Sequence, residues 1–152
     1  MSQGTRCRQL AEYVVFESPL NMLCDSPTNY DREEECTEFI ATIPTVWEQT
    51  IAMNGEIGKY ITMARRKGDV WYVGSLTNWD ARTLTLDLSF LGAGRWKAEM
   101  FHDGVNANRL ASDYQKTVTD IPASRKLTVK NGTRRRMRIE NIQRIIHRLF
   151  KR

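Results

Sequence analysis

The hydrophobic residues of this 152-residue chain change their spacing near residue 54. Before that point they recur at intervals of three and four, as on one face of a helix, and after it they alternate with polar residues. The alternation is clearest in residues 84–90, where leucine or phenylalanine occupies every second position. Because this pattern is typical of antiparallel sheets with one solvated face, we expect such a sheet in the second part of the chain.

Several strands are predicted between residues 54 and 130. The runs 60–66 and 70–76 are separated by residues 67–69, Lys-Gly-Asp, a sequence typical of a hairpin turn. Further strand-like runs occupy residues 95–101, 114–121 and 126–130. Short strands at this spacing, separated by turns rich in glycine, asparagine and aspartate, predict a small antiparallel β-sandwich.

Residues 1–53 predict a different architecture. Their apolar spacing indicates helices around residues 10–15, around 20–23 and over 31–40, and a short strand over 45–50. Pro19 separates the first two helices, residues 25–29 carry turn residues, and Asp31 is placed to cap the third helix. Helices and a strand without a core of their own are typical of a piece of an α/β layered or barrel domain. The whole chain therefore has an α+β fold class.

The charge is concentrated at one end of the sequence. The chain has 23 Lys and Arg against 18 Asp and Glu, a net charge of +5. Residues 131–152 carry eight basic residues and one acidic residue, so this tail is strongly basic and the remaining 130 residues are slightly acidic. Apolar residues at helical spacing between Ile139 and Phe150 make the tail amphipathic. One hypothesis is therefore a small β-domain whose tail binds nucleic acid or an anionic membrane.

The sequence contains no targeting or membrane signal that we can identify. No stretch approaches the roughly 18–20 apolar residues of a membrane span. The first residues lack the basic start and apolar core of a signal peptide, so the chain as written is expected to be cytoplasmic.

Residues that could carry chemistry are few. Cys7, Cys24 and Cys36 form no Cys-x-x-Cys pair, and His102 lies far from His147, so neither a metal site nor a cofactor is predicted. Buried or unreactive thiols are the favoured interpretation of the cysteines.

Three carboxylates lie near the ends of predicted elements, where α/β sites form, namely Glu17, Asp25 and Glu48. Each could act as a general acid or base, but capping, turn or surface roles are favoured because no pairing is visible. Trp47 could stack on a ligand ring beside Glu48, or pack at a domain junction. Trp47 and Glu48 are therefore candidates for proximity to substrate, and no catalytic residue is assigned.

Several runs in the same order resemble the C-terminal part of glycoside hydrolase family 97, the α-glucosidases and α-galactosidases of Bacteroides-type bacteria. They are residues 4–11 (GTRCRQLA), 17–20 (ESPL), 25–27 (DSP), 44–50 (PTVWEQT), 64–69 (ARRKGD) and 88–91 (LSFL). The resemblance implies that residues 1–53 are the last helices and last strand of a catalytic (β/α)₈ barrel. It implies that residues 54–130 are most of a C-terminal β-sandwich linked to oligomerisation.

The resemblance places the catalytic carboxylates and the calcium ligands of the family upstream of this chain. It also implies an oligosaccharide substrate and a periplasmic location for the whole enzyme. Three positions depart from the family: Arg8 stands where histidine is usual, and Glu48 and Gln49 give Trp-Glu-Gln-Thr over residues 47–50 instead of Trp-Asp-Glu-Thr. A glycosidase holds two carboxyl groups roughly 5–9.5 Å apart across the scissile bond. The chain alone is therefore expected to be inactive, and exposed barrel helices and a sheet edge are expected to promote self-association.

The last 22 residues interrupt this resemblance. The family closes its last strand with a Met-Ala-Pro-Gly-Gly-Gly-like run followed by Ala-x-Arg-Ile, whereas Lys130 is followed here by Asn-Gly-Thr-Arg-Arg-Arg. Codons can be chosen for residues 131–142 that encode Met-Ala-Pro-Gly-Gly-Gly-Cys-Ala-Leu-Arg-Ile when read one base later. We therefore expect a one-base insertion after the Lys130 codon, which would make residues 131–152 an out-of-frame translation.

Overall fold

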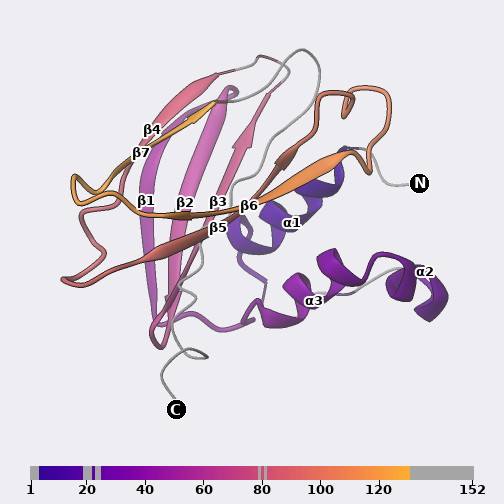
Figure 1. Ribbon diagram of the computed structural model, residues 1–152, viewed down its shortest axis with the longest axis horizontal. Helices are drawn as coiled ribbons and strands as arrows, with labels where there is room; N and C mark the ends of the chain where they lie inside the picture. The colour runs from indigo at the N-terminus through magenta and orange to yellow at the C-terminus, as the bar shows by residue number, and fades with distance from the viewer. Residues whose placement is uncertain (1–3, 19–21, 23–24, 79, 81, 131–152) are drawn as a thin grey trace.

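The computed structural model describes residues 4–18, 22, 25–78, 80 and 82–130, and Figure 1 shows their arrangement. Within this part of the chain, three helices precede seven strands. The helices are α1 (Arg6–Val15), α2 (Pro27–Arg32) and α3 (Glu34–Thr42). The strands are β1 (Gln49–Glu56), β2 (Tyr60–Lys67), β3 (Val70–Thr77), β4 (Thr83–Asp87), β5 (Lys97–Asp103), β6 (Tyr114–Asp120) and β7 (Lys126–Lys130).

All strand pairs are antiparallel. β1, β2 and β3 form a three-stranded sheet in that order, which we call the meander sheet, while β4 pairs with β7 and β5 with β6. The β2–β3 hairpin keeps one register from Tyr60↔Thr77 to Lys67↔Val70, as its turn sequence predicts. β1 is less regular, because a bulge between Ala52 and Asn54 shifts its register against β2. The antiparallel sheets predicted after the helices are therefore confirmed.

One hydrophobic core lies between the meander sheet and the two strand pairs. We call it the strand core. Its buried members are Ala64, Trp71, Val73, Leu84, Leu86, Leu88, Leu91, Trp96, Ala98, Ile121 and Val129. β4 shows how the sequence builds it: Leu84 and Leu86 are buried, whereas the intervening threonines and the final aspartate are exposed. The alternation that predicted this strand thus reflects one face in the core and one in water.

A second core lies on the opposite face of the meander sheet, under the helices. We call it the helix core. Its buried members are Cys7, Leu10, Ala11, Val14, Val15, Cys36, Phe39, Tyr72, Leu76 and Phe101. β3 contributes to both cores, with Trp71 and Val73 on one face and Tyr72 and Leu76 on the other. Because both faces of β3 are covered, its sequence is nearly continuously apolar instead of alternating.

The approach of α1 to β3 is closest at Gly74. A Cβ atom on this residue would lie 3.0 Å from Val14 Cβ, 3.0 Å from Val15 Cγ2 and 3.2 Å from the Ala11 carbonyl oxygen. Glycine in a strand interior marks such a close backbone approach. The absence of a side chain at Gly74 therefore allows α1 to pack directly on the sheet.

Both ends of α1 are also bonded to the strand region. The Arg6 backbone N–H donates to the Ala111 carbonyl at 2.8 Å, in the connection between β5 and β6. At the other end, the buried Arg65 guanidinium of β2 donates to the Val15 carbonyl at 3.2 Å. A cation at a helix C-terminus satisfies an otherwise unpaired carbonyl and opposes the negative end of the helix dipole. α1 and the strands consequently form one packed unit, as Figure 1 shows.

The loop and the helix start predicted between residues 25 and 42 lie at other positions in the structure. The loop predicted over residues 25–29 contains the start of α2, which begins at Pro27 with Ser26 as its N-cap. Asp31 lies inside α2 and does not cap the next helix, which begins at Glu34. Proline is favoured at the first helical position because its fixed φ angle suits the helix and its missing N–H has no intrahelical partner there. The Ser-Pro sequence therefore starts a helix here.

The strand predicted over residues 45–50 is displaced. β1 begins at Gln49, continues to Glu56 and pairs with β2, so the predicted boundary between residues 53 and 54 lies inside this strand. Just before the strand, Trp47 packs on Tyr72, and the Glu48 side chain bonds to the hairpin turn between β2 and β3.

The remaining strands differ from their predictions only at the ends. β4 ends at Asp87, whose Oδ1 accepts a hydrogen bond from the Ser89 N–H at 3.0 Å and so turns the chain. β5 begins two residues later than predicted, whereas β6 and β7 match closely. The helix predicted around residues 20–23 and the basic tail 131–152 lie outside the described residues, apart from Met22.

Candidate functional site

Trp47 lies where the chain passes from α3 to β1. Its ring meets the Tyr72 ring edge-on with centroids 5.4 Å apart, and the Arg65 guanidinium carbon lies 5.7 Å from the Trp47 ring centroid. The side chain is partly buried against the helix core. These contacts favour the interpretation of Trp47 as a residue that packs at a junction. Its predicted proximity to substrate stays a prediction.

Glu48 is bonded to the turn between β2 and β3. Its Oε2 accepts a hydrogen bond from the Gly68 N–H at 3.0 Å, and its Oε1 lies 3.4 Å from Lys67 Nζ. The Gly68 N–H, followed by Lys67, lowers the pKa of the Glu48 carboxyl. A general acid needs a pKa near the working pH, so this carboxylate is suited to closing the hairpin and unsuited to donating a proton.

The other two candidate carboxylates are also peripheral. Asp25 Oδ1 accepts hydrogen bonds from Asn29 Nδ2 at 2.6 Å and from the Ser26 N–H at 2.7 Å, next to the start of α2. The Asn29 side chain, followed by the Ser26 N–H, lowers the pKa of Asp25. Glu17 is exposed after the end of α1. Turn and surface roles thus describe these two residues, as the sequence favoured.

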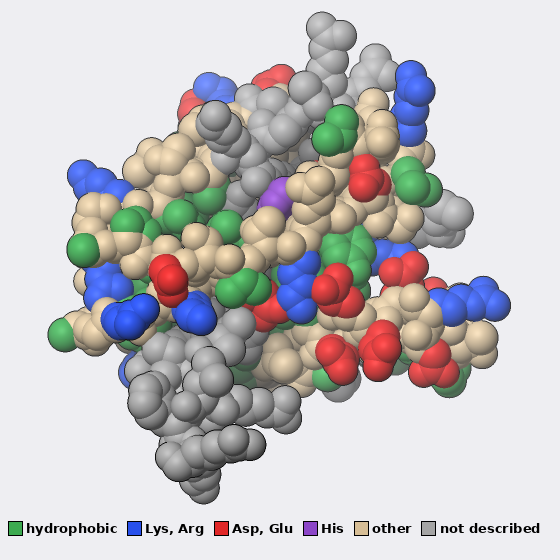
Figure 2. All heavy atoms as spheres, viewed as in Figure 1, with side chains coloured by type: hydrophobic (Ala, Val, Ile, Leu, Met, Phe, Trp, Pro, Cys, Tyr) green, Lys and Arg blue, Asp and Glu red, His purple; other side chains and the backbone are tan. Residues whose placement is uncertain are grey.

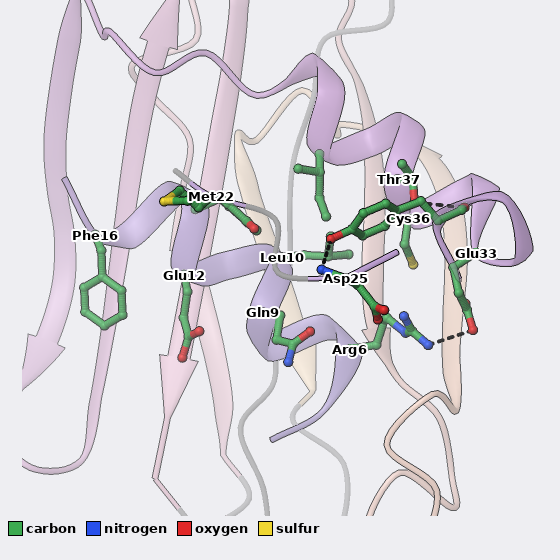
Figure 3. Close-up of a pocket in the computed structure, with 13 residues that line it drawn as sticks. Arg6, Gln9, Leu10, Glu12, Phe16, Met22, Asp25, Glu33, Cys36 and Thr37 are labelled. Atoms are coloured by element: carbon green, nitrogen blue, oxygen red, sulfur yellow. Dashed lines mark hydrogen bonds and ion pairs between the residues drawn. The ribbon is translucent and has the colours of Figure 1, made fainter. Parts of the chain in front are cut away.

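A pocket of about 410 Å³ opens between α1 and the α2–α3 segment, as Figure 3 shows. At one end, Arg6 and Glu33 form an ion pair of 2.7 Å. At the other end, Phe16 and Met22 line the pocket, and their side chains are 58% and 74% exposed. Large exposed apolar side chains next to a concave surface are typical of a contact with further polypeptide. The apolar spacing of the sequence predicts exposed helix faces but does not reveal this pocket.

The surface beyond the pocket is acidic. Figure 2 shows carboxylate side chains gathered over α2 and α3, at the lower right of the view. The sequence of these helices explains it, because residues 31–38 contain five acidic residues and one basic residue. Three of these acids fall in or next to the first turn of α3, where negative charge is favoured by the helix dipole.

The structure brings together a pair of carboxylates that the sequence did not reveal. Lys116 Nζ lies 2.6 Å from Glu99 Oε1 and 3.3 Å from Glu35 Oε1, and the Tyr114 hydroxyl donates to Glu35 Oε2 at 2.7 Å. The two Oε1 atoms therefore lie no more than about 6 Å apart, so two carboxylates share one site, as in retaining glycosidases.

This carboxylate pair is not arranged for glycosidase chemistry. The Lys116 ammonium group occupies the space between the carboxylates, where a glycosidic oxygen would have to lie. Burial alone would lower the pKa of Lys116, but Glu99 and then Glu35 outweigh it and raise the pKa. Because the lysine stays charged and holds both acids, the cluster serves to bond α3 to β5 and β6.

The described residues offer little further chemistry. Within these ranges no group of three or more His, Cys, Asp and Glu side chains is placed to hold a metal ion. Cys7 and Cys36 are buried thiols, and burial raises the pKa of Cys36, so the interpretation of buried thiols is confirmed for both. No helix in the described part of the chain is long and apolar enough to cross a membrane.

Comparison with known proteins identifies the family. Residues 46–135 match the family described as glycosyl-hydrolase 97 C-terminal, oligomerisation. This match includes all seven strands and more than half of the chain. The chain therefore belongs to the glycoside hydrolase family 97 C-terminal domains, in agreement with the resemblance found in the sequence.

Individual relatives agree with this assignment. A retaining α-galactosidase of Bacteroides thetaiotaomicron is 60% identical over 129 residues, which are 85% of this chain and 20% of that protein. A probable retaining α-galactosidase of Streptomyces bingchenggensis is 29% identical over 96 residues, which are 63% of this chain and 15% of that protein. A solved family 97 enzyme from Pseudoalteromonas sp. strain K8, in complex with acarbose, has a TM-score of 0.80 and 37% identity, covering 92% of this chain and 23% of that one.

The chain matches only a small part of the length of each relative. The chain spans about a fifth of the length of the curated α-galactosidase of Bacteroides thetaiotaomicron and about a quarter of the solved enzyme. It corresponds to the C-terminal part of a family 97 enzyme.

Proposed function

We propose that this chain is the C-terminal, non-catalytic part of a retaining α-galactosidase, and that it stabilises and oligomerises the enzyme without performing the reaction. The observation that carries the proposal is the 60% identity over 129 residues to the Bacteroides thetaiotaomicron α-galactosidase. The substrate of the whole enzyme would be an oligosaccharide with an α-linked galactose. α-Glucosides are the second substrate class, since the solved relative was bound to acarbose.

Within this proposal, the residues before β1 are the end of the catalytic barrel. Two observations support this origin. The helix core closes only with help from β3 and β5, so the helices have no core of their own. Phe16 and Met22 also present a large apolar surface beside the pocket between α1 and α3. In the complete enzyme, earlier barrel elements would cover these side chains.

The absence of catalysis by the chain alone follows from the chemistry of its carboxylates. Retaining hydrolysis needs one carboxylate as nucleophile and one carboxylic acid whose pKa is raised. Glu48 and Asp25 have lowered pKa values, and Glu35 and Glu99 both form ion pairs with Lys116. The proposal therefore assigns both catalytic groups to the barrel upstream.

An aryl α-galactosidase assay on two proteins tests the proposal. The first is the chain itself, which should release no aryl alcohol above buffer. The second is a chimera in which residues 4–130 replace the matching C-terminal segment of the Bacteroides thetaiotaomicron enzyme, and it should be active. That enzyme cut before the matching segment serves as the control. Turnover by the chain alone, or an inactive but folded chimera, would contradict the proposal.

The same chimera tests the two substrate-proximal candidates. Trp47→Phe and Glu48→Gln should raise KM for the galactoside if these side chains approach the sugar, with kcat little changed. An unchanged KM in both variants would leave them with the packing and turn roles described above. The variants are conservative, so the hairpin contact of Glu48 is weakened while the fold is kept.

The proposal includes the origin of residues 131–152, which lie outside the described residues. We propose that they are translated out of frame after Lys130, in place of a closing strand. Sequencing the DNA on both sides of the Lys130 codon tests this directly. A single frame that continues from the strands into the tail, with no family-like ending one base later, would contradict it.

A further inference from the structure

β6 has an open edge in the described part of the chain. It pairs with β5 through seven consecutive residue pairs, from Lys97↔Asp120 to Asp103↔Tyr114, and with no other described strand. Four consecutive residues, Gln115–Val118, are exposed. Because successive side chains of a strand point to opposite faces, these exposed residues lie on both faces of β6. No described strand pairs with the backbone donors and acceptors on its outer edge.

The other outer strands are protected in ways that β6 is not. β1 carries the bulge between Ala52 and Asn54, which interrupts regular pairing, and it also contains Gly55. β4 and β7 are only five residues long, and β3 and β5 have no exposed residue. Bulges and short edge strands are the devices by which proteins avoid pairing edge to edge. β6 has seven residues in one register, with neither proline nor glycine.

The side chains of β6 also favour pairing. Thr117, Val118 and Thr119 are β-branched, and Val118 is 56% exposed. A lysine on an edge strand usually repels a second copy, but Lys116 is bonded to Glu35 and Glu99 of its own chain. The one cation in the middle of the strand is therefore already compensated.

We propose that β6 is the self-association surface of this chain, and that its partner is β6 of a second copy. The inference deepens the proposed function, on which it rests, by naming the surface through which an oligomerisation domain would associate. A two-fold axis through Thr117 pairs the strands antiparallel, with Thr117 opposite itself and Lys116 opposite Val118 of the second copy. Asp120 then lies opposite Tyr114, so no like charges meet.

Two substitutions test the pairing from opposite faces of the strand. Val118→Lys replaces the exposed apolar side chain of the pairing strand with an ammonium group that would have to lose its water in the interface, and Thr117→Lys places two lysines opposite each other on the axis. In the single chain, Val118 lies across from Glu99 in the β5–β6 register, so Val118→Lys gains an internal partner and should fold. Ile57→Lys is the matched control, because Ile57 is fully exposed in the turn between β1 and β2.

Sedimentation velocity over a concentration series of the full chain measures the effect. Both β6 variants should raise the dissociation constant at least about tenfold, while Ile57→Lys should stay within about twofold of the unmodified chain. Amide hydrogen exchange should become slower on β6 as the concentration rises. These results together would support the proposal, since only strand pairing is sensitive to both faces of β6.

Three results would overturn it. If only one β6 variant lost association, the contact would involve one face of the β5–β6 pair and not the edge of β6. Association that is unchanged in both variants, but lost in Phe16→Lys, would place the contact at the pocket and leave the proposed function intact. A chain that is monomeric at every concentration would remove both this surface and the self-association part of the proposed function, while the chimera assay would still test the α-galactosidase part.

Discussion

The two cores on either face of the meander sheet are built by different means. The strand core is lined by apolar side chains, from strands and the turns between them. The helix core joins α1 and α3 to β3 and β5, and polar bonds surround it, including those of Arg65 to Val15 and of Tyr72 to Thr42. The strand core can therefore be predicted from the alternation of apolar and polar residues, whereas the helix core depends on contacts between segments that are far apart in the sequence.

The largest expected effects come from the same truncation in each core. Leu86→Ala in the strand core and Leu10→Ala in the helix core each remove a side chain that is at most 1% exposed. Each should lower the free energy of unfolding by about 2–5 kcal/mol, because a cavity is left in a packed interior. Urea unfolding monitored by circular dichroism should show one transition in both variants. Two separate transitions in Leu10→Ala would show instead that the two cores unfold independently.

The next effect concerns the contact between α1 and the sheet. Gly74→Ala adds a methyl group that would lie 3.0 Å from two side-chain atoms of α1. The helix must shift to relieve this contact, so the free energy of unfolding should fall by about 1–3 kcal/mol. Gly92→Ala is the control, because nothing lies within 4 Å of a Cβ at that position. Equal stability of the two variants would show that α1 is not held tightly on β3.

A smaller effect is expected at the hydrogen bond between the helix core and α3. The Tyr72 hydroxyl donates to the Thr42 carbonyl at 2.7 Å, at the end of α3. Tyr72→Phe keeps the ring contact with Trp47 and removes only this bond. The free energy of unfolding should fall by about 0.5–1.5 kcal/mol in chemical denaturation. A neutral result would mean that water satisfies the carbonyl equally well.

The smallest effect is a pH dependence at the hairpin turn. Because the folded-state pKa of Glu48 is lowered, its contribution to stability is present above the ordinary value of 4.5 and is lost as the pH falls through the folded value. Glu48→Gln should therefore be slightly less stable than the unmodified chain at about pH 7, and the difference should shrink at about pH 3.5. Glu38→Gln, at an exposed position of α3, is the control. A difference that grows in acid would contradict the assigned bond to Gly68.

The sequence predicted the strands better than the helical region for physical reasons. β4 could be located because Leu84 and Leu86 face the core while their neighbours face water, and β2–β3 because Gly68 supplies the positive φ angle of the turn. α2 was missed because its six residues bury no side chain, so no periodicity marks it. The Ser-Pro start of that helix is present in the sequence, but the same residues are also typical of a turn.

The candidate site was less predictable than the fold. Glu48 could be singled out by its position, but its bond to Gly68 joins residues that are 20 positions apart. The cluster of Glu35, Glu99 and Lys116 could not be found, because its members lie on three elements and only the folded chain brings them together. The family was indicated only by the order of several short runs, such as residues 44–50 and 64–69, which spacing alone does not reveal.

The contact at Gly74 also bears on how this segment could be exchanged between genes. A recombination break in the connection before β1 would transfer all seven strands, yet it would leave behind the helix that covers Tyr72 and Leu76. The transferred sheet would have an uncovered apolar face where α1 normally packs. A break upstream of α1 would keep that face covered. The smallest segment that could be transferred with a covered sheet therefore begins with α1, and the strands alone do not form such a unit.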